Sequence, residues 1–439
     1  MQVKIVISVY FIVVLAVGVY SYFRIKTPAD FYISGKKAGL ISVTGSMLAT
    51  ILGGSAILGT IELSKAMGWP AIWFLCSAAI GLFLLLPLIK NINKTGHFTM
   101  PELLETFYGQ KAKQIASVII PVAWIGIVAV QIIAAAKILA GLGFISYNES
   151  AVLAGFVFIV FTLVGGQIGI LRTDTLQSVI LIAGLFVVFL FSLLKHDLQT
   201  VETFRFDALF NRTFNPVDLI ILILTYSTTF VIGPDIYSRV FCAKDEKVAT
   251  KAILINAILL IVLAVVLTWL GFFAETDENN GLISFAALKL PGWIHGLFIA
   301  ALLSAIISSG TTLLNAAMIL SDMTTGNLNS KNALKITQLY IVIIGVSSII
   351  IALFITSIIQ TLLFALTIYS GAFFVPTLAG LLNIKVNKKR VLMVIIAGGI
   401  MALSGKIIKD FFHDFWGSCI IILTYVLNSI LLFTPSRKI

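Results

Sequence analysis

The sequence predicts an all-α integral membrane protein with about 13 transmembrane helices. The chain has 439 residues, of which 59% are hydrophobic and only 11% are charged, whereas soluble domains carry about 25% charged residues. The apolar residues fall into many blocks of about 20 residues, each long enough to cross roughly 30 Å of hydrocarbon as a helix. Strand-like alternation is absent, which argues against a membrane β-barrel. We therefore expect a single membrane domain over nearly the whole chain.

The apolar blocks give thirteen predicted spans. The first block, 3–23, is too long for the apolar region of a typical signal peptide and no small-residue cleavage site follows it, so we interpret it as a retained helix. All thirteen blocks are read in the same way. They cover residues 3–23, 40–66, 69–90, 114–140, 150–168, 175–195, 217–238, 249–273, 291–321, 336–357, 361–383, 391–408 and 415–434.

The distribution of Lys and Arg predicts the orientation of these spans. An odd number of spans places the two termini on opposite sides of the membrane. With the N-terminus outside, 21 of the 30 Lys and Arg residues lie on the cytoplasmic side, as positively charged loops prefer. We therefore attribute the net charge of +11 to the cytoplasmic excess of Lys and Arg in a membrane protein, and not to nucleic-acid binding. We expect a multi-pass protein of the plasma or inner membrane, with its C-terminus in the cytoplasm.

Two predicted spans are interrupted. The second contains the Gly-Gly-Ser stretch 53–55, and the seventh contains the polar run 225–229 followed by Gly-Pro at 233–234. Glycine weakens a helix and proline removes a backbone donor, so irregular backbone here needs protein or a wet cavity to satisfy it. The interruptions lie five spans apart, an odd number, so a repeat of that size would be inverted, as at many transport sites. Alternatively, the glycines only allow close helix packing.

At these interruptions the sequence resembles the sodium:solute symporter family, which includes sodium-coupled sugar, proline and sialic acid importers. The resemblance implies the leucine-transporter-type fold, in which the first and sixth core helices are broken. It implies inverted five-helix repeats at about 40–195 and 217–383, one extra helix at 3–23 and two C-terminal helices within 391–434. The motifs that carry it are residues 30–36, 46–59, 99–104 with 108–109, 172–177 and 304–315.

The same resemblance implies a sodium site. Sodium needs oxygen ligands, and an unwound helix can supply main-chain carbonyls at membrane depth. The family's site maps onto the main-chain oxygens of Ala49, Leu52 and Ala305 and the hydroxyls of Ser308 and Ser309. Taken without the family, the two serines could simply bond back to carbonyls of their own helix.

Asp174 and several other charged residues lie near predicted span ends. Asp174 begins the sixth span, where the family places an aspartate on the inner exit path of sodium or in a second sodium site; otherwise it is a solvated helix-end residue. Lys137 could attract an anionic solute but is better explained as reaching the outer surface. The remaining residues are interpreted as rim residues: Glu62 and Lys65 at the outer rim, Asp235 and Arg239 at the inner rim.

The solute pocket should lie beside the two interruptions. Sugar-transporting members use amides and carboxylates there, but this chain has mostly apolar residues, which cannot compensate the desolvation of many hydroxyls. The chain does not match the family's sialic acid or proline patterns at every position either, so the identity of the solute stays open, and a small, partly apolar organic solute is expected. The candidate residues are Ile51, Gly53, Ser55 and Ala56 from the first break, Trp73 and Phe74 from the next span, Tyr226, Ser227 and Thr228 from the second break, and Tyr369 and Ser370.

The function predicted from these residues is sodium-coupled import of a small organic solute by alternating access. A proton-coupled transporter of the same fold would want a buried carboxylate near the breaks, and we expect none. A transporter-like solute sensor would need a signalling domain, and a channel would need a polar stripe along its spans. An enzyme is least expected, because the four histidines are scattered near span ends.

The orientation can be tested by labelling introduced cysteines with a membrane-impermeant reagent. We expect Asn148→Cys and Asn279→Cys to react in intact cells, because both lie in segments predicted to be external, and Asn387→Cys to react only after permeabilisation. Labelling of Asn387→Cys in intact cells would reverse the orientation.

Overall fold

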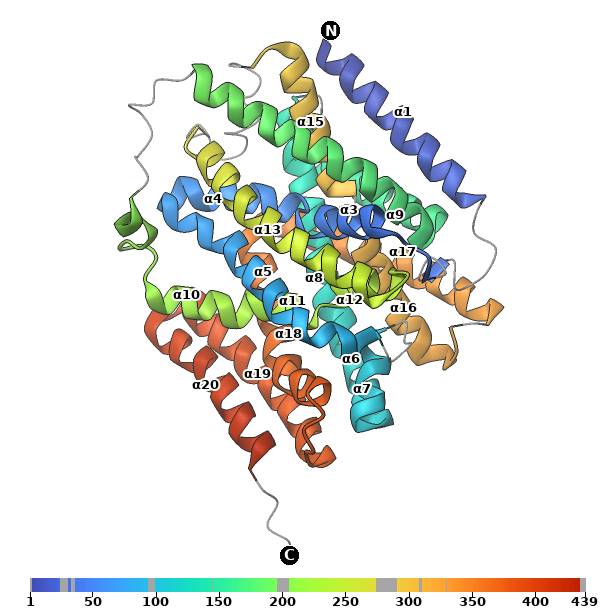
Figure 1. Cartoon of the computed structure of the whole chain (residues 1–439), viewed down its shortest axis with the longest axis vertical. Helices are drawn as coiled ribbons and strands as arrows, with labels where there is room; N and C mark the ends of the chain where they lie inside the picture. Colours follow the sequence, from blue (N-terminus) through green and yellow to red (C-terminus); the bar gives the residue numbers. More distant parts are fainter. Residues whose placement is uncertain are drawn as a thin grey trace, which may run out of the picture.

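A computed structural model describes residues 2–23, 31–32, 36–93, 99–143, 145–195, 205–273, 290–307, 310–328 and 330–434. Its secondary structure is helical, apart from one isolated bridge between Ala38 and Ala243. The helices are drawn in Figure 1. They are α1 (Gln2–Tyr22), α3 (Leu40–Ile51), α4 (Gly54–Met67), α5 (Ile72–Leu85), α6 (Ile89–Asn93), α7 (Met100–Tyr108), α8 (Gln110–Gly141), α9 (Tyr147–Lys195), α10 (Pro216–Leu222), α11 (Thr228–Ile232), α12 (Pro234–Cys242), α13 (Glu246–Gly271), α15 (Gly292–Ile307), α16 (Gly310–Thr325), α17 (Lys331–Phe354), α18 (Ile358–Leu381), α19 (Lys388–Phe411) and α20 (Asp414–Phe433).

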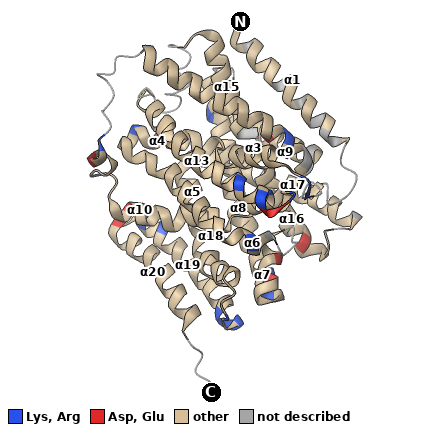
Figure 2. Cartoon of the chain, in the orientation of Figure 1, with Lys and Arg blue, Asp and Glu red and all other residues tan. Residues whose placement is uncertain are grey.

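The expected multi-pass membrane architecture is confirmed. Within the described residues, 11 helical segments are long and apolar enough to cross a bilayer, and the bent pair α3 and α4 adds a twelfth. The predicted count of thirteen is reached only if α1, with 21 residues, is added. Charged residues are sparse along these helices and gather in a few places, one of them beside α16 and α17 (Figure 2).

Side-chain caps begin several of these helices. Thr99 and Glu102 form a capping box at α7, and Asn215 forms another with Asp218 at α10, where Pro216 occupies the first turn. Asp245 caps α13 by accepting the backbone N–H of Val248. Each cap satisfies backbone N–H groups that have no partner inside the helix, so these local residues fix where the helix starts.

The predicted spans 150–168 and 175–195 belong to one helical element. Helix α9 runs without interruption over 49 residues and supplies two membrane-length segments, Tyr147–Val164 and Gly169–Leu194. Asp174 was expected at the end of a span, but it lies more than one turn inside the second segment and is fully buried. The alternative of a solvated helix-end residue is therefore wrong.

The first predicted break is present between α3 and α4. The two helices meet at an angle of 48°, with Leu52 ending α3 and Gly53 in an extended conformation (φ −59°, ψ 169°) preceding α4. The amide of Gln131 from α8 lies so close to Gly53 that a Cβ atom there would stand 2.9 Å from its nitrogen. Close approach of this amide explains the glycine.

The second break falls at Gly233, between α11 and α12. The polar run before it stays helical as a π-helical turn (Ile223–Ser227) continuing into α11. Gly233 has extended backbone (φ −68°, ψ 124°). Two tyrosines satisfy carbonyls freed nearby: the hydroxyl of Tyr369 donates to Ile232 O at 2.6 Å, and that of Tyr237 donates to Val231 O at 2.7 Å. The break is thus built into the structure by side chains from its own span and from α18.

The two broken spans are also joined to each other. The backbone N–H of Ala38, just before α3, donates to Cys242 O at 3.1 Å, and the N–H of Lys244 donates to Ala38 O at 3.0 Å. Helices α3 and α12 pack together. Helix α3 also packs extensively on α9, and α12 also contacts α16. At the edges of the bundle, α1 packs on α9 and α15, while α19 and α20 pair on the opposite side (Figure 1).

Candidate transport site

A cavity of about 90 Å³ lies between the two broken spans. It is lined by α3 and α4 from the first broken span and by the π-helical turn, α11 and α12 from the second. Helices α8, α16 and α18 complete its wall. We call this cavity the chamber. Its lining residues are Thr50, Ile51, Ser55, Trp124, Ile127, Gln131, Tyr226, Thr229, Phe230, Asp235, Ile236, Thr312, Leu362 and Leu366.

Gln131 holds the first break against the chamber. Its side-chain N–H donates to the hydroxyl of Ser55 at 2.7 Å, and its side-chain oxygen accepts the backbone N–H of Ser55 at 3.3 Å. This N–H is one of the first in α4 and has no partner inside that helix. The amide therefore acts as a cap supplied by α8, and it leaves few free polar groups for a solute at this end.

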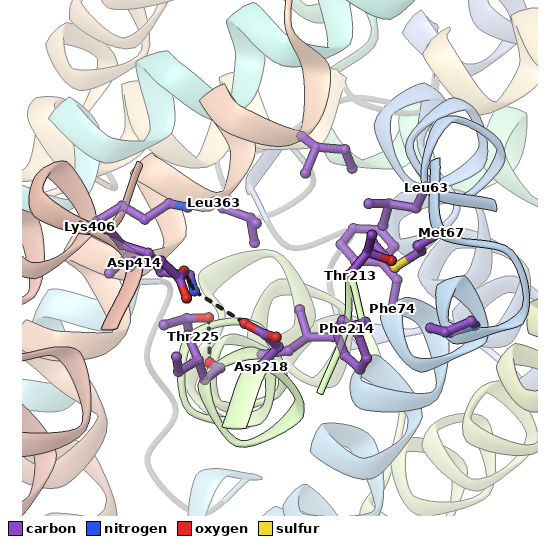
Figure 3. Close-up of a pocket in the computed structure, with 16 residues that line it drawn as sticks. Leu63, Met67, Phe74, Thr213, Phe214, Asp218, Thr225, Leu363, Lys406 and Asp414 are labelled. Carbon is purple, nitrogen blue, oxygen red and sulfur yellow. Dashed lines mark hydrogen bonds and ion pairs between the residues drawn. The ribbon is translucent and has the colours of Figure 1, made fainter. Parts of the chain in front are cut away.

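A second cavity, the vestibule, has a volume of about 290 Å³. Figure 3 shows it between Leu63 and Met67 on one side and Lys406 and Asp414 on the other. It lies among segments that the charge pattern predicts to be external. Ion pairs cross it from α10 to α19: Lys409 Nζ lies 3.2 Å from an Asp218 carboxylate oxygen and also pairs with Asp414.

An aromatic pair separates the vestibule from the chamber. Phe74, which lines the vestibule, stacks on Tyr226, which lines the chamber, with ring centroids 4.4 Å apart and an interplanar angle of 8°. Phe230 meets Tyr226 edge-on at 5.1 Å. Such pairs stabilise their contact by roughly 0.5–1.5 kcal/mol beyond area burial.

Asp235 brings a carboxylate to the chamber from the first turn of α12. One of its oxygens accepts the indole N–H of Trp124 at 3.2 Å and the hydroxyl of Thr312 at 3.1 Å. The other accepts the amide N–H of Asn315 at 2.6 Å. These donors come from α8 and α16, so the carboxylate links the second break to two further helices.

Arg239, one turn further along α12, is fully buried and occupies the centre of a polar network. Its guanidinium lies 3.3 Å from an Asp174 carboxylate oxygen, which also accepts the hydroxyl of Ser46 at 2.6 Å. The same guanidinium donates to Thr311 at 2.7 Å and to Thr50. Helices α3, α9, α12 and α16 thus meet at one charge pair.

The structure describes part of the predicted sodium site. Ala49, Leu52 and Ala305 are all fully buried, on elements that contact each other. Ser308 and Ser309 lie outside the described residues, so their role stays a prediction. The second carboxylate oxygen of Asp174 is buried and has no hydrogen-bond partner among the described residues. This oxygen is therefore available to coordinate a cation.

Three of the predicted solute-binding residues line the chamber: Ile51, Ser55 and Tyr226. Phe74 lines the vestibule instead. Trp73 turns to the 205–215 segment, where its indole N–H donates to Leu209 O at 3.1 Å and its ring stacks on Phe210. The other predicted residues do not line either cavity. They are Gly53, Ala56, Ser227, Thr228, Tyr369 and Ser370.

Several charged residues differ from their sequence interpretation. Asp235 and Arg239 are not inner-rim residues, because one lines the chamber and the other is fully buried. The expectation that no carboxylate lies near a break is therefore also wrong. Lys137 pairs with Glu62 at 2.9 Å, which leaves its interpretation as an outer-surface residue unchanged.

Sequence reasoning missed Gln131, Trp124, Thr312 and Asn315 as chamber residues or their partners. Gln131 did carry a signal, because it is a lone amide inside the long apolar run of α8. Asp235 carried another, since it directly follows the Gly-Pro break. Trp124 and Thr312 offer no such signal, as tryptophan and threonine are common in membrane helices.

Two broken helices around a central chamber define a secondary transporter of the leucine-transporter type. The chain belongs to the sodium:solute symporter family, whose family model matches residues 31–398. It is therefore a sodium-coupled symporter, with sodium as its coupling ion.

Individual relatives agree with this assignment. The chain is 23% identical to a sodium/proline symporter of Haemophilus influenzae over 388 residues, covering 79% of this chain and 76% of the relative. It is 23% identical over 377 residues to the sodium/sialic acid symporter SiaT of Proteus mirabilis, covering 77% and 75%. A solved substrate-bound, outward-open Na⁺-coupled sialic acid symporter superposes with a TM-score of 0.78 at 19% identity, covering 100% of this chain and 99% of that one.

The Asp174–Arg239 pair predicts a non-additive mutational response. Asp174→Asn keeps the side-chain volume but leaves a buried guanidinium without its counter-charge, and breaking a buried pair costs about 3–5 kcal/mol. We expect a lower melting temperature in detergent and reduced uptake for Asp174→Asn and for Arg239→Gln. The decrease in melting temperature of the double variant should be clearly smaller than the sum of the decreases in the two single variants. Additive losses would mean that the two side chains act independently.

Proposed function

We propose that this symporter imports a small organic solute, which occupies the chamber while sodium binds beside the first break. The observation that carries the proposal is the chamber itself, lined by residues of both broken spans, Ile51 and Ser55 from one and Tyr226 and Asp235 from the other. A solute held there contacts both spans at once, so its binding can bias how they sit relative to each other.

The proposed sodium ligands are the main-chain oxygens of Ala49, Leu52 and Ala305 and the hydroxyls of Ser308 and Ser309. The bend of 48° after Ile51 supports this assignment, because helix breaks free carbonyls that can coordinate an ion. Asp174 would act later, on the cytoplasmic exit path. Its unpartnered buried oxygen supports a passing contact with the ion.

The composition of the chamber supports a partly apolar solute. Isoleucines, leucines and aromatic rings form most of its wall, and the amide of Gln131 is already engaged by Ser55. A sugar would lose the hydration of many hydroxyls without recovering their hydrogen bonds. The relatives named above transport proline or sialic acid; of these, the smaller solute suits a chamber of this size better.

Alternating access would use the two cavities in turn. With the vestibule external, a solute would pass Phe74 and Tyr226 to reach the chamber, and their stacking would close behind it. Sodium can drive this uptake, since moving one charge through about 100 mV yields roughly 2.3 kcal/mol. A tenfold sodium gradient adds about 1.4 kcal/mol, so one ion could support an accumulation of several hundred-fold. The proposed orientation has the N-terminus outside the cell membrane.

The sodium site is tested by Ser308→Ala and Ser309→Ala. Each change removes one oxygen ligand but leaves a small side chain that folding should tolerate. We expect the sodium concentration for half-maximal uptake to rise at least about tenfold, equal to about 1.4 kcal/mol, and solute affinity at fixed sodium to fall with it, because the coupling is reciprocal.

Ser347→Ala is the matched control, because this hydroxyl of α17 bonds back to Ile343 O at 2.9 Å and lies outside the proposed site. It should leave sodium dependence unchanged. If both test variants also behave like wild type at equal expression, the serines only bond their own helix and the sodium assignment fails.

A further inference from the structure

The chamber wall carries a carboxylate that forms no ion pair with the described side chains around it. Asp235 is the one charged residue among the described residues that line it. Arg239 is the next cation along α12, but its guanidinium pairs with Asp174 and reaches only the backbone oxygen of Asp235, at 3.2 Å. The described residues place no ion-pair partner within 4.0 Å of the Asp235 carboxylate. Arg239 attracts Asp235 from one helix turn away but is matched in formal charge by Asp174, so the three side chains together carry one unit of negative formal charge.

Burial opposes a charge on Asp235, but several neighbouring groups stabilise the ionised form of its carboxylate. Trp124, Thr312 and Asn315 supply three donors from neutral side chains, and hydrogen bonds to the charged form stabilise it. Asp235 also lies in the first turn of α12, where the helix dipole favours a negative group. The site is thus built to hold an anion, and an anion at membrane depth attracts a cation.

The walls beside Asp235 suit an organic cation better than a metal ion. Trp124, Tyr226 and Phe230 line the same chamber, and aromatic faces attract ammonium groups by roughly 0.5–2 kcal/mol. Sodium prefers a shell of oxygen atoms, which aromatic and aliphatic walls do not supply.

We propose that the transported solute carries a positively charged nitrogen, and that Asp235 binds this ammonium group against the aromatic wall of the chamber. The proposal rests on the proposed function, in which the chamber holds the solute, and it narrows the solute class to small ammonium compounds, including zwitterions. Apolar parts of the solute would lie against Ile51, Ile127 and Leu362, which line the remaining wall.

The test compares ammonium probes with uncharged-nitrogen counterparts of the same shape. Choline and glycine betaine are each paired with the isostere in which a quaternary carbon replaces the nitrogen, and proline is paired with cyclopentanecarboxylate. Thermal shifts of the purified full-length protein are recorded in sodium chloride and in potassium chloride at equal ionic strength. We expect at least one ammonium probe to stabilise the protein in sodium, and its counterpart to bind at least about tenfold more weakly.

Asp235→Asn then assigns the recognition to this carboxylate, because it removes the charge and keeps the shape. It should weaken binding of the ammonium probe at least about tenfold while the thermal shift caused by sodium alone persists. Asp207→Asn, the same change on an exposed segment paired with Arg205, is the control and should bind the probe like wild type.

Each other result contradicts the proposal. A probe without a charged nitrogen that binds as well as its ammonium partner would overturn it, and so would sodium-dependent stabilisation with no response to any ammonium probe. Loss of the sodium shift in Asp235→Asn would make Asp235 an ion ligand. If Asp235→Asn binds the probes like wild type but its uptake no longer depends on pH, Asp235 is a proton carrier. If sodium stabilises neither wild type nor the control, the sodium-coupled function fails instead.

Discussion

The charge pair between Arg239 and Asp174 is the interaction on which the centre of this protein depends. Both side chains are fully buried, and an isolated charge at this depth would be far more costly than a paired one. Because the guanidinium also bonds Ser46, Thr50 and Thr311, neutralising it requires α3, α9, α12 and α16 to meet at one point. That meeting holds the first broken span, through α3, next to the second, through α12.

The breaks can persist because side chains from other helices replace the lost helical hydrogen bonds. Gln131 caps α4 beside the first break, and Tyr369 satisfies the carbonyl of Ile232 beside the second. These partners come from α8 and α18, so the irregular backbone is fixed only in the folded bundle. Phe74 and Tyr226, by contrast, are in contact through ring stacking. A bundle held by hydrogen bonds and a contact held by stacking suit the fixed and moving parts of a transporter.

The sequence predicted the architecture better than the site. Apolar blocks of membrane length and the glycine and proline interruptions are local signals, so the membrane helices and the breaks near Gly53 and Gly233 could be read directly. The arrangement of those helices came from the family resemblance. The chamber depends on which face of each helix turns inward, which local composition does not reveal. Trp73 and Phe74 are adjacent in sequence, yet one packs on the 205–215 segment and the other lines the vestibule. Arg239 was misread for a related reason, since its partner Asp174 lies 65 residues away.

The same arginine also decides which of two aspartates can serve the chamber. Asp174 and Asp235 both lie near Arg239, but among the described residues the guanidinium forms its ion pair with Asp174. That pairing neutralises the fully buried carboxylate and leaves Asp235, held by neutral donors, as the exposed charge of the chamber wall. Had the arginine turned to Asp235, the chamber would be electrically neutral and Asp174 would be an uncompensated buried anion. The rotamer of one side chain therefore separates a carboxylate paired inside the bundle from one that can recognise a solute.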